Sequence, residues 1–283
     1  MSQYYKPNRN PDWNYPGKQW RLSRSKIDLF LNCQRCFYID NKLGVARPPG
    51  YPFSLNSAVD ALLKKEFDIH RAAQTQHPLL KAYGLDAVPF SDSRMDEWRD
   101  SLKRGIRHLH KETGLLVSGG VDDVWITPKK ELLIVDYKAT AKKEEVSLDA
   151  EWQIGYKRQM EVYQWLFRQN NFTVSDTGYF VYVNGKTDKD AFDGKLEFDV
   201  SLLPYTGDAS WIEGTLRDIK ATLESGEIPP AAAECDYCRY REAAGKALRE
   251  AQGKAPIERP TTLVMKKLAK KENEKEQKTA QLF

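Results

Sequence analysis

Two aspartates and a lysine on neighbouring predicted strands are the residues best suited to catalysis. They lie in the stretch VDDVWITPKKELLIVDYKAT, residues 121–140. Two apolar runs flank a turn at Thr127–Lys130, a pattern that predicts a β-hairpin. Because side chains alternate along a strand, Asp136 and Lys138 share one face. Asp122 falls in the partner strand, where its carboxylate can lie beside that of Asp136.

The two carboxylates predict a site for a hard divalent cation, Mg²⁺ or Mn²⁺. Lys138 can orient a water molecule and offset the charge that develops on a phosphate. The alternative is a D-x-K sequence that occurs by chance and only solvates an edge strand. The apolar run Leu132–Val135 argues against it, because such a run predicts a central strand covered on both faces, where charges cost more.

Two neighbouring features favour a functional site. Gly119–Gly120 precede Asp122 and permit a bulge or a close backbone approach. A helix is predicted over residues 145–169, and Gln159 and Tyr163 share one face of it because they stand four residues apart. That face can point at the aspartates. We interpret four other large side chains of this segment as core residues: Trp152, Tyr156, Met160 and Phe167.

The order of these residues resembles a known nuclease family. G-x-Asp122, Asp136-x-Lys138 and Gln159-x-x-x-Tyr163 are similar to motifs of the RecB-like branch of PD-(D/E)XK nucleases, which includes exonuclease V and the nuclease of CRISPR spacer acquisition. The resemblance implies a Mg²⁺- or Mn²⁺-dependent deoxyribonuclease with a restriction-endonuclease-like core. It implies that Asp122 and Asp136 bind the metal and that Lys138 is the catalytic lysine. Gln159 and Tyr163 would position DNA or the lysine.

The resemblance also implies two further metal contacts. The backbone carbonyl of Tyr137 would touch the ion. A helix predicted over residues 54–69 corresponds to one that often carries a metal-binding His in the family, and Asp60 stands in that place here. Asp60 is either a substitute ligand or an exposed helical residue. The segment Leu22–Tyr38 resembles the family's opening element, with Gln34 in place of the usual proline.

The four cysteines form two C-x₂-C pairs, Cys33/Cys36 and Cys235/Cys238. Structural disulfides are not expected in a reducing cytoplasm, and scattered buried thiols would not pair in this way. Four thiolates suit either a [4Fe–4S] cluster or a structural Zn²⁺ ion. RecB-like nucleases often carry an iron–sulfur clasp, with one N-terminal and three C-terminal cysteines. This chain has two and two; we favour the cluster and keep zinc as the alternative.

Composition sets the frame for these motifs. The 283 residues, 41% of them hydrophobic, suit one large folded domain. We expect an irregular arm at 1–20, a nuclease domain at 21–249 and a charged, disordered tail at 250–283. A net charge of +4 does not by itself indicate nucleic acid. No long apolar stretch or signal-peptide pattern occurs, so we expect a cytoplasmic protein without a membrane partner.

The remaining segments complete an α/β prediction. We expect a central mixed sheet of four or five strands, flanked by helices, with the terminal segments joined by the cysteine clasp. Strands are predicted at 178–183 and 195–203, and helices at 93–112 and 209–225. His108 and His110 fall in the first of these helices, where we interpret them as solvated.

The resulting functional prediction is a metal-dependent nuclease that acts on single-stranded DNA or duplex ends. Repair, recombination and phage- or CRISPR-related processing are the expected settings, and a helicase or replication partner cannot be named from the sequence. The alternative is a non-catalytic nucleic-acid-binding protein that keeps the nuclease fold. Intact Asp122, Asp136 and Lys138 argue against it, because a decayed site usually loses one such residue.

Overall fold

The computed structural model describes residues 9–48, 50, 54–143 and 145–254. The chain divides into two units, residues 1–235 and 236–283. In the second unit the described residues form helix α8 (Asp236–Lys254). Most of the tail expected at 250–283, from residue 255 on, lies outside the described residues, as do residues 1–8 of the expected arm.

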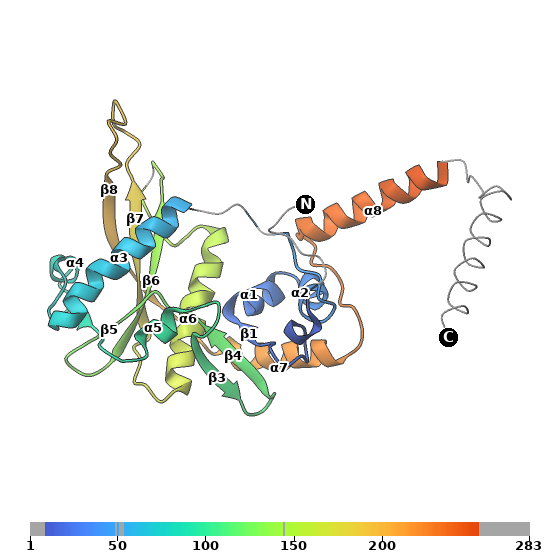
Figure 1. Cartoon of the computed structure of the whole chain (residues 1–283), viewed down its shortest axis with the longest axis horizontal. Coiled ribbons are helices and arrows are strands. Elements are labelled where there is room, and N and C mark those ends of the chain that lie inside the picture. Colours follow the sequence, from blue (N-terminus) through green and yellow to red (C-terminus); the bar gives the residue numbers. More distant parts are fainter. Residues whose placement is uncertain (1–8, 49, 51–53, 144, 255–283) are drawn as a thin grey trace, which may run out of the picture. The chain divides into compact units, whose positions relative to one another are not determined.

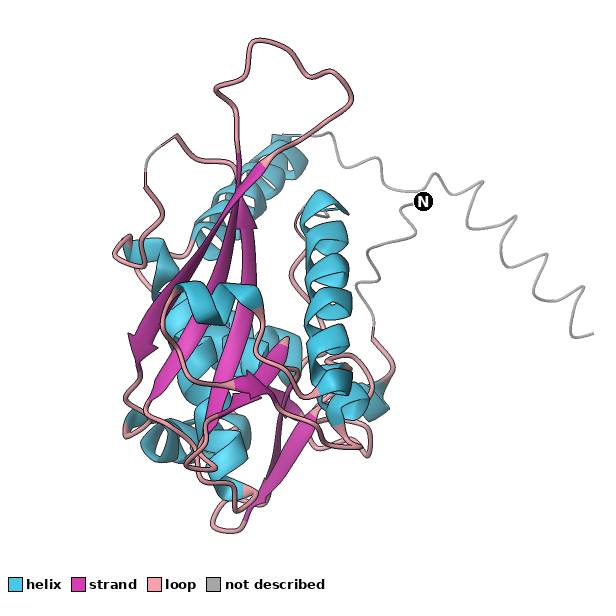
Figure 2. Cartoon of the chain, turned by 90° about the vertical axis from the view of Figure 1, so that its left-hand side faces the viewer, coloured by secondary structure: helices cyan, strands magenta, loops and turns pink. Residues whose placement is uncertain are grey.

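A mixed sheet forms the centre of the first unit (Figure 1, Figure 2). Within the described residues it has five strands, in the spatial order β2 (Val88–Pro89), β5 (Asp123–Ile126), β6 (Leu132–Thr140), β7 (Thr177–Gly185) and β8 (Phe198–Thr206). β6 and β7 pair in parallel, and the other neighbours are antiparallel. The mixed sheet expected from the sequence is therefore confirmed.

The β5–β6 hairpin forms where the apolar runs predicted it. Asp123 pairs with Val135 and Ile126 with Leu132, and Lys130 in the turn has a φ of 63°. The first six residues of β6 are buried. Because hydrogen-bonded strands lie on both sides of β6, the charged residues near its end lie inside the sheet rather than at an edge.

Helices cover both faces of this sheet (Figure 1). On one face, Ile134 and Phe180 join a core cluster with residues of α1 (Arg24–Asn32), α2 (Gln34–Asn41), α6 (Ile154–Gln169) and α7 (Trp211–Glu224). On the other, Val135 and Val181 pack with residues of α3 (Ser54–Ala73) and α4 (Pro78–Ala82). The alternation along β6 thus places Asp136 and Lys138 on the face that α6 covers.

A smaller sheet adjoins the first, and it corrects one sequence prediction. Its strands are β1 (Leu22–Ser23), β4 (Leu115–Gly119) and β3 (Ile106–His110), in that spatial order. The helix predicted over 93–112 is wrong: α5 (Met95–Arg99) is short, and β3 follows Gly105, whose φ is 75°. Strand β3 forms because its backbone pairs with β4 through the 110–115 hairpin.

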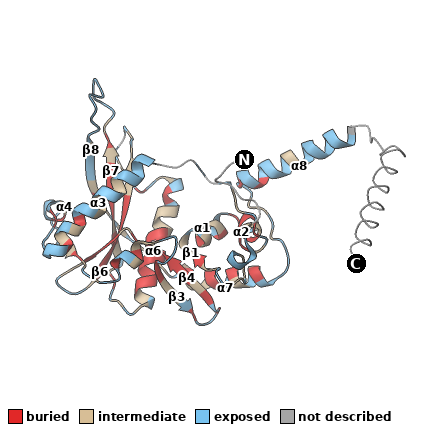
Figure 3. Ribbon diagram, in the orientation of Figure 1, coloured by how far each residue is buried: buried red, intermediate tan, exposed pale blue. Residues whose placement is uncertain are grey.

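Two interpretations of side chains are also corrected. His110 is buried rather than solvated, and its ring nitrogens lie 2.8 Å from Thr113 Oγ1 and 2.8 Å from Glu213 Oε2. The helix predicted from residue 145 begins later, with the 3₁₀ turn η2 (Glu151–Gln153) before α6. Met160 and Phe167 are core residues as expected, whereas Trp152 is 56% exposed. Figure 3 shows the burial along α6.

Two further observations complete the description. A 3₁₀ turn, η1 (Pro11–Trp13), precedes β1. None of the helices within the described ranges is long and apolar enough to cross a membrane.

Candidate active site and cysteine cluster

Strand β6 and helix α6 bring four of the predicted residues into contact. The Nε2 group of Gln159 donates to Asp136 Oδ1 at 2.7 Å and to the Tyr163 hydroxyl at 3.1 Å. Lys138 Nζ lies 3.4 Å from Gln159 Oε1 and forms an ion pair with Asp136. The face of α6 that carries Gln159 and Tyr163 therefore points at the carboxylate, as the spacing suggested.

Two glycines, Gly119 and Gly120, allow the backbone at the end of β4 to approach helix α6 and Ser101 closely. A Cβ atom on Gly119 would lie 2.6 Å from the Tyr163 ring, and one on Gly120 would lie 2.5 Å from Ser101 Cβ. Real Cβ atoms do not approach other atoms so closely. The Gly119–Gly120 pair is thus required where β4 passes α6 and the loop at Ser101.

Asp122 lies directly before β5 and faces two groups. Its Oδ2 accepts a hydrogen bond from the Tyr137 backbone N–H at 2.9 Å, and its Oδ1 lies 3.2 Å from Lys64 Nζ. Lys64, on α3, also donates to Asp60 Oδ2 at 2.8 Å. Asp60 therefore joins the other predicted residues through Lys64. These residues, with Lys138, line a cavity of about 580 Å³.

The cations near Asp136 do not fully offset the cost of burying its carboxylate. Burial raises the pKa of Asp136, the Lys138 ammonium lowers it, and the nearby Asp122 carboxylate raises it; the net result is a pKa of about 6. Asp136 Oδ2 is buried, and the Lys138 ammonium is its partner. Two carboxylates held this close repel each other unless a cation lies between them.

The donor set fits a hard divalent cation. Asp122 and Asp60 line the cavity with Tyr137, and Asp136 is buried close enough to Asp122 for the two charges to interact. Mg²⁺ and Mn²⁺ prefer ligands of this kind. A cation would also relieve the repulsion between Asp122 and Asp136, so the residues present suit a divalent ion.

Comparison with known families decides the assignment. The family model described as "PD-(D/E)XK nuclease superfamily" matches residues 21–243. The chain belongs to this superfamily. PD-(D/E)XK nucleases use divalent metals, and membership indicates a nuclease.

The other comparisons add less. A solved chain titled "Crystal structure of SSO0001" is 15% identical; the match covers 78% of this chain and 84% of that one, with a TM-score of 0.34. No curated protein matches the chain.

The opposite face of the PD-(D/E)XK hairpin holds a buried charge network that sequence reasoning missed. The Tyr137 hydroxyl donates to Asp123 Oδ2 at 2.8 Å, and Asp123 is fully buried between Arg71 and Arg99. Arg99 Nε also donates to the Asp122 carbonyl at 3.0 Å. The network therefore fixes the backbone that presents Asp122.

Parts of this network had a signal in the sequence. The Asp122–Asp123 doublet places adjacent carboxylates on opposite sides of a strand, and a buried one needs cationic partners. Lys64 stands one helical turn after Asp60. Tyr156, interpreted as core, is instead half-buried in the cavity, and Lys138 Nζ lies 4.5 Å from the centre of its ring.

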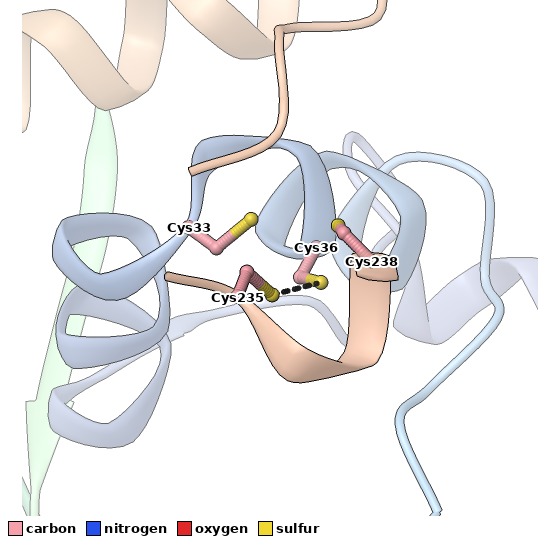
Figure 4. A group of neighbouring side chains, drawn as sticks. All are labelled: Cys33, Cys36, Cys235 and Cys238. Carbon is pink, nitrogen blue, oxygen red and sulfur yellow. Dashed lines mark hydrogen bonds between the residues drawn. The ribbon is translucent and has the colours of Figure 1, made fainter. Parts of the chain in front are cut away.

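The four cysteines gather in one place, as their pairing predicted (Figure 4). Their sulfur atoms all lie within 4.8 Å of one another, and Cys36 Sγ is 3.6 Å from Cys235 Sγ. Cys33 and Cys36 come from the start of α2, and Cys235 directly precedes α8. Arg35 Nε donates to the Pro229 carbonyl at 2.9 Å beside the cluster, which holds the two segments of the first unit together.

Polar groups around the sulfurs favour thiolates. Burial raises the pKa of Cys33, but backbone hydrogen bonds from Ala232 and Cys36, together with hydrogen bonds from the Cys235 and Cys36 thiols, lower it to about 6. Arg47 Nη2 lies 3.5 Å from Cys235 Sγ. Deprotonated thiols bind metals, so the cluster is suited to a metal centre.

Proposed function

We propose that this protein is a Mg²⁺- or Mn²⁺-dependent deoxyribonuclease of the RecB-like branch. The observation that carries the proposal is Asp136: a fully buried carboxylate close to Asp122, with Lys138 paired to its Oδ2 and Gln159 donating to its Oδ1. A structural ion pair would not need the second carboxylate. A cation-binding site does.

Each residue has a role in phosphodiester hydrolysis. Asp122 and Asp136 would hold the ion, with the Tyr137 carbonyl and Asp60 as further ligands. The bound ion would supply Lewis acidity to the phosphate and to water. Lys138 would orient the attacking water and offset the charge that develops on the phosphate, while Gln159 and Tyr163 keep Asp136 and Lys138 in place.

The alternative, a binding protein without activity, is less well supported. A site that had lost its chemistry would not need to keep the contacts that join Asp136, Lys138, Gln159 and Tyr163. The settings that we propose are DNA repair, recombination or phage- or CRISPR-related processing in the cytoplasm.

The direct test is cleavage of labelled single-stranded DNA, duplex DNA and RNA with Mg²⁺, Mn²⁺ or EDTA. We expect DNA to be cut with either ion and to remain intact with EDTA. Lys138→Ala should lower the rate by ~10² with the metal still bound. Lys142→Ala, which removes a lysine that stacks on Trp152, is the matched control. DNA binding without cleavage under every metal condition would favour the alternative.

We also propose that the four cysteines hold a structural metal centre. The RecB-like resemblance predicts a [4Fe–4S] cluster. The sulfur spacing supports zinc: bonds of 2.3 Å place the sulfurs of a tetrahedral site about 3.8 Å apart, and a cluster, in which each thiolate binds a different iron, places them farther apart. Metal analysis and the visible absorbance of protein purified without oxygen decide between them.

A further inference from the structure

A second cavity, of about 500 Å³, adjoins the proposed active site. Asp122, Gly120 and Ser101 line both this cavity and the one beside α3. Gln159 and Tyr163 also reach it from α6. The two cavities therefore meet at Asp122, so a chain-like substrate can extend to either side of the reaction centre.

The lining of this second cavity is strongly basic. Its cations are Arg9, Arg21, Arg24 and Lys26, and Asp122 is the one acidic residue among the described lining residues. Arg9 is paired with Asp40 at 2.8 Å. Within the described ranges, the other three form no ion pair with a carboxylate.

Two of these three cations are held by backbone carbonyls. Arg21 donates to the carbonyl of Lys103 at 2.7 Å, and Lys26 donates to the carbonyl of Arg21 at 2.8 Å. Burial and, to a smaller extent, the positive charge of Arg9 lower the pKa of Lys26 to about 8. Their charges are thus positioned but not neutralised.

Arg24 has the least satisfied charge of the group. It is the first residue of α1 and is half-buried, yet its guanidinium makes no hydrogen bond or ion pair among the described residues. It lies close enough to Asp136 and Tyr163 for its charge to act on both. A partly desolvated cation without an acceptor is unfavourable until an anion binds.

We propose that this cavity binds the phosphodiester next to the scissile one in a single nucleic-acid strand, with Arg24 as its main contact and Lys26 as a second. Arginine suits this role because its planar guanidinium donates two parallel hydrogen bonds to a phosphate. A cavity of this size holds a ligand of about one or two nucleotides, so an unpaired strand fits better than a duplex. The inference rests on the proposed nuclease function.

Binding in EDTA tests the contact without cleavage. Arg24→Gln should weaken the binding of a short single-stranded oligonucleotide about tenfold and reduce the slope of log K against log salt by about 0.7, the value for one phosphate contact. Arg217→Gln is the matched control, because it removes an equal charge from an exposed pair with Glu112. It should bind like wild type. Because Arg24 has no protein partner to lose, its variant should melt no lower than wild type.

Substrates with a fixed register test the position of the contact. Each substrate is a thymidine dinucleotide that carries a p-nitrophenyl phosphate ester at one end, so it has one scissile phosphate and one neighbouring phosphodiester. The neighbouring group is either the charged phosphodiester or a neutral methylphosphonate. Two isomers, with the p-nitrophenyl ester at the 5′ or the 3′ end, are compared. In one isomer, replacing the neighbouring phosphodiester by the methylphosphonate should lower the kcat/KM of wild type about tenfold. The same replacement should leave the kcat/KM of Arg24→Gln unchanged. If the substitution and the neutral neighbour lower kcat/KM independently in both isomers, the proposed subsite is wrong. It is also wrong if Arg24→Gln binds the oligonucleotide as tightly as Arg217→Gln does. Either result would leave the nuclease proposal standing. Wild type that cuts neither these esters nor DNA with Mg²⁺ or Mn²⁺ would overturn the nuclease proposal, and the subsite with it.

Discussion

Adjacent aspartates have opposite environments at the start of β5. Asp122 borders both cavities, whereas Asp123 is fully buried against two arginines. Asp122→Asn should abolish cleavage and leave the melting temperature nearly unchanged. Asp123→Asn should instead lower the free energy of unfolding by about 3–5 kcal/mol, because it leaves buried guanidinium charge without its partner. Thermal melting and cleavage assays of both variants give the comparison; equal stability of the two would refute the distinction.

Two glutamines on α6 provide a second matched pair. Gln159 contacts Asp136, Lys138 and Tyr163, whereas buried Gln164 donates to the Ser175 and Asp176 carbonyls. Gln159→Ala should slow cleavage about tenfold or more with little change in melting temperature. Gln164→Ala should lower stability by ~1–3 kcal/mol and leave the rate of the folded enzyme unchanged. The reverse pattern would assign Gln159 to the core.

At the scale of elements, the β5–β6 hairpin was predictable and β3 was not. The apolar run Leu132–Val135 and the turn before it act locally, and their pattern is long enough to define a strand. Ile106–His110 is only five residues long and follows a charged, helix-like segment. This segment is a strand because it pairs with β4, and the sequence of five residues alone does not predict that pairing.

Site residues divide in the same way. Asp122, Asp136, Lys138, Gln159 and Tyr163 lie in one stretch whose spacing indicates how they meet. Arg24, Lys64 and Arg99 come from three separate helices that precede the hairpin. No local spacing connects them to the hairpin, so only the packing of α1, α3 and α5 reveals their position.

The close packing of β4 on α6 makes its own prediction. Gly119→Ala should lower stability by ~1–3 kcal/mol and reduce cleavage, because the new Cβ would displace the Tyr163 ring. Gly214→Ala on α7 is the control, since a Cβ there meets no atom within 4 Å. It should raise stability by ~0.5–1 kcal/mol through helix propensity. Melting curves and rates that do not differ between the two would argue against the close approach.

At the scale of the whole molecule, the cysteine cluster closes most of the chain into one loop. Cys36 and Cys235 are 199 positions apart, and their sulfurs are in contact. Fixing so long a loop restricts the unfolded chain, and metal binding adds its free energy to folding. The predicted clasp is thus a matter of stability rather than of the reaction itself.

Loss of one ligand tests the clasp. Cys235→Ser should lose bound metal and lower the free energy of unfolding by several kcal/mol, with activity falling only as the protein unfolds. Wild type stripped of metal is the control and should melt like the variant. A Cys235→Ser protein that keeps its metal and the wild-type melting temperature would contradict a structural centre.

We propose that Asp136 binds a catalytic cation, and burying its charge has a predictable cost in stability. In the metal-free protein, burial raises the pKa of Asp136 from 3.8 to about 6. Between these values the folded state keeps a proton that the unfolded state releases, so this group stabilises the fold as pH falls through about 6. Metal and proton compete for the carboxylate, and apparent metal affinity should fall below this pH.

The most direct measurement is calorimetric titration of Mg²⁺ or Mn²⁺ into wild type and Asp136→Asn at neutral pH, with cleavage measured on the same samples. We predict that wild type binds the ion and cuts DNA, and that the variant does neither while remaining folded and no less stable without metal. Asp199→Asn, which removes a carboxylate from an exposed pair with Lys186, should behave like wild type. Cleavage of DNA by Asp136→Asn at the wild-type rate would contradict the role of Asp136 as a metal ligand.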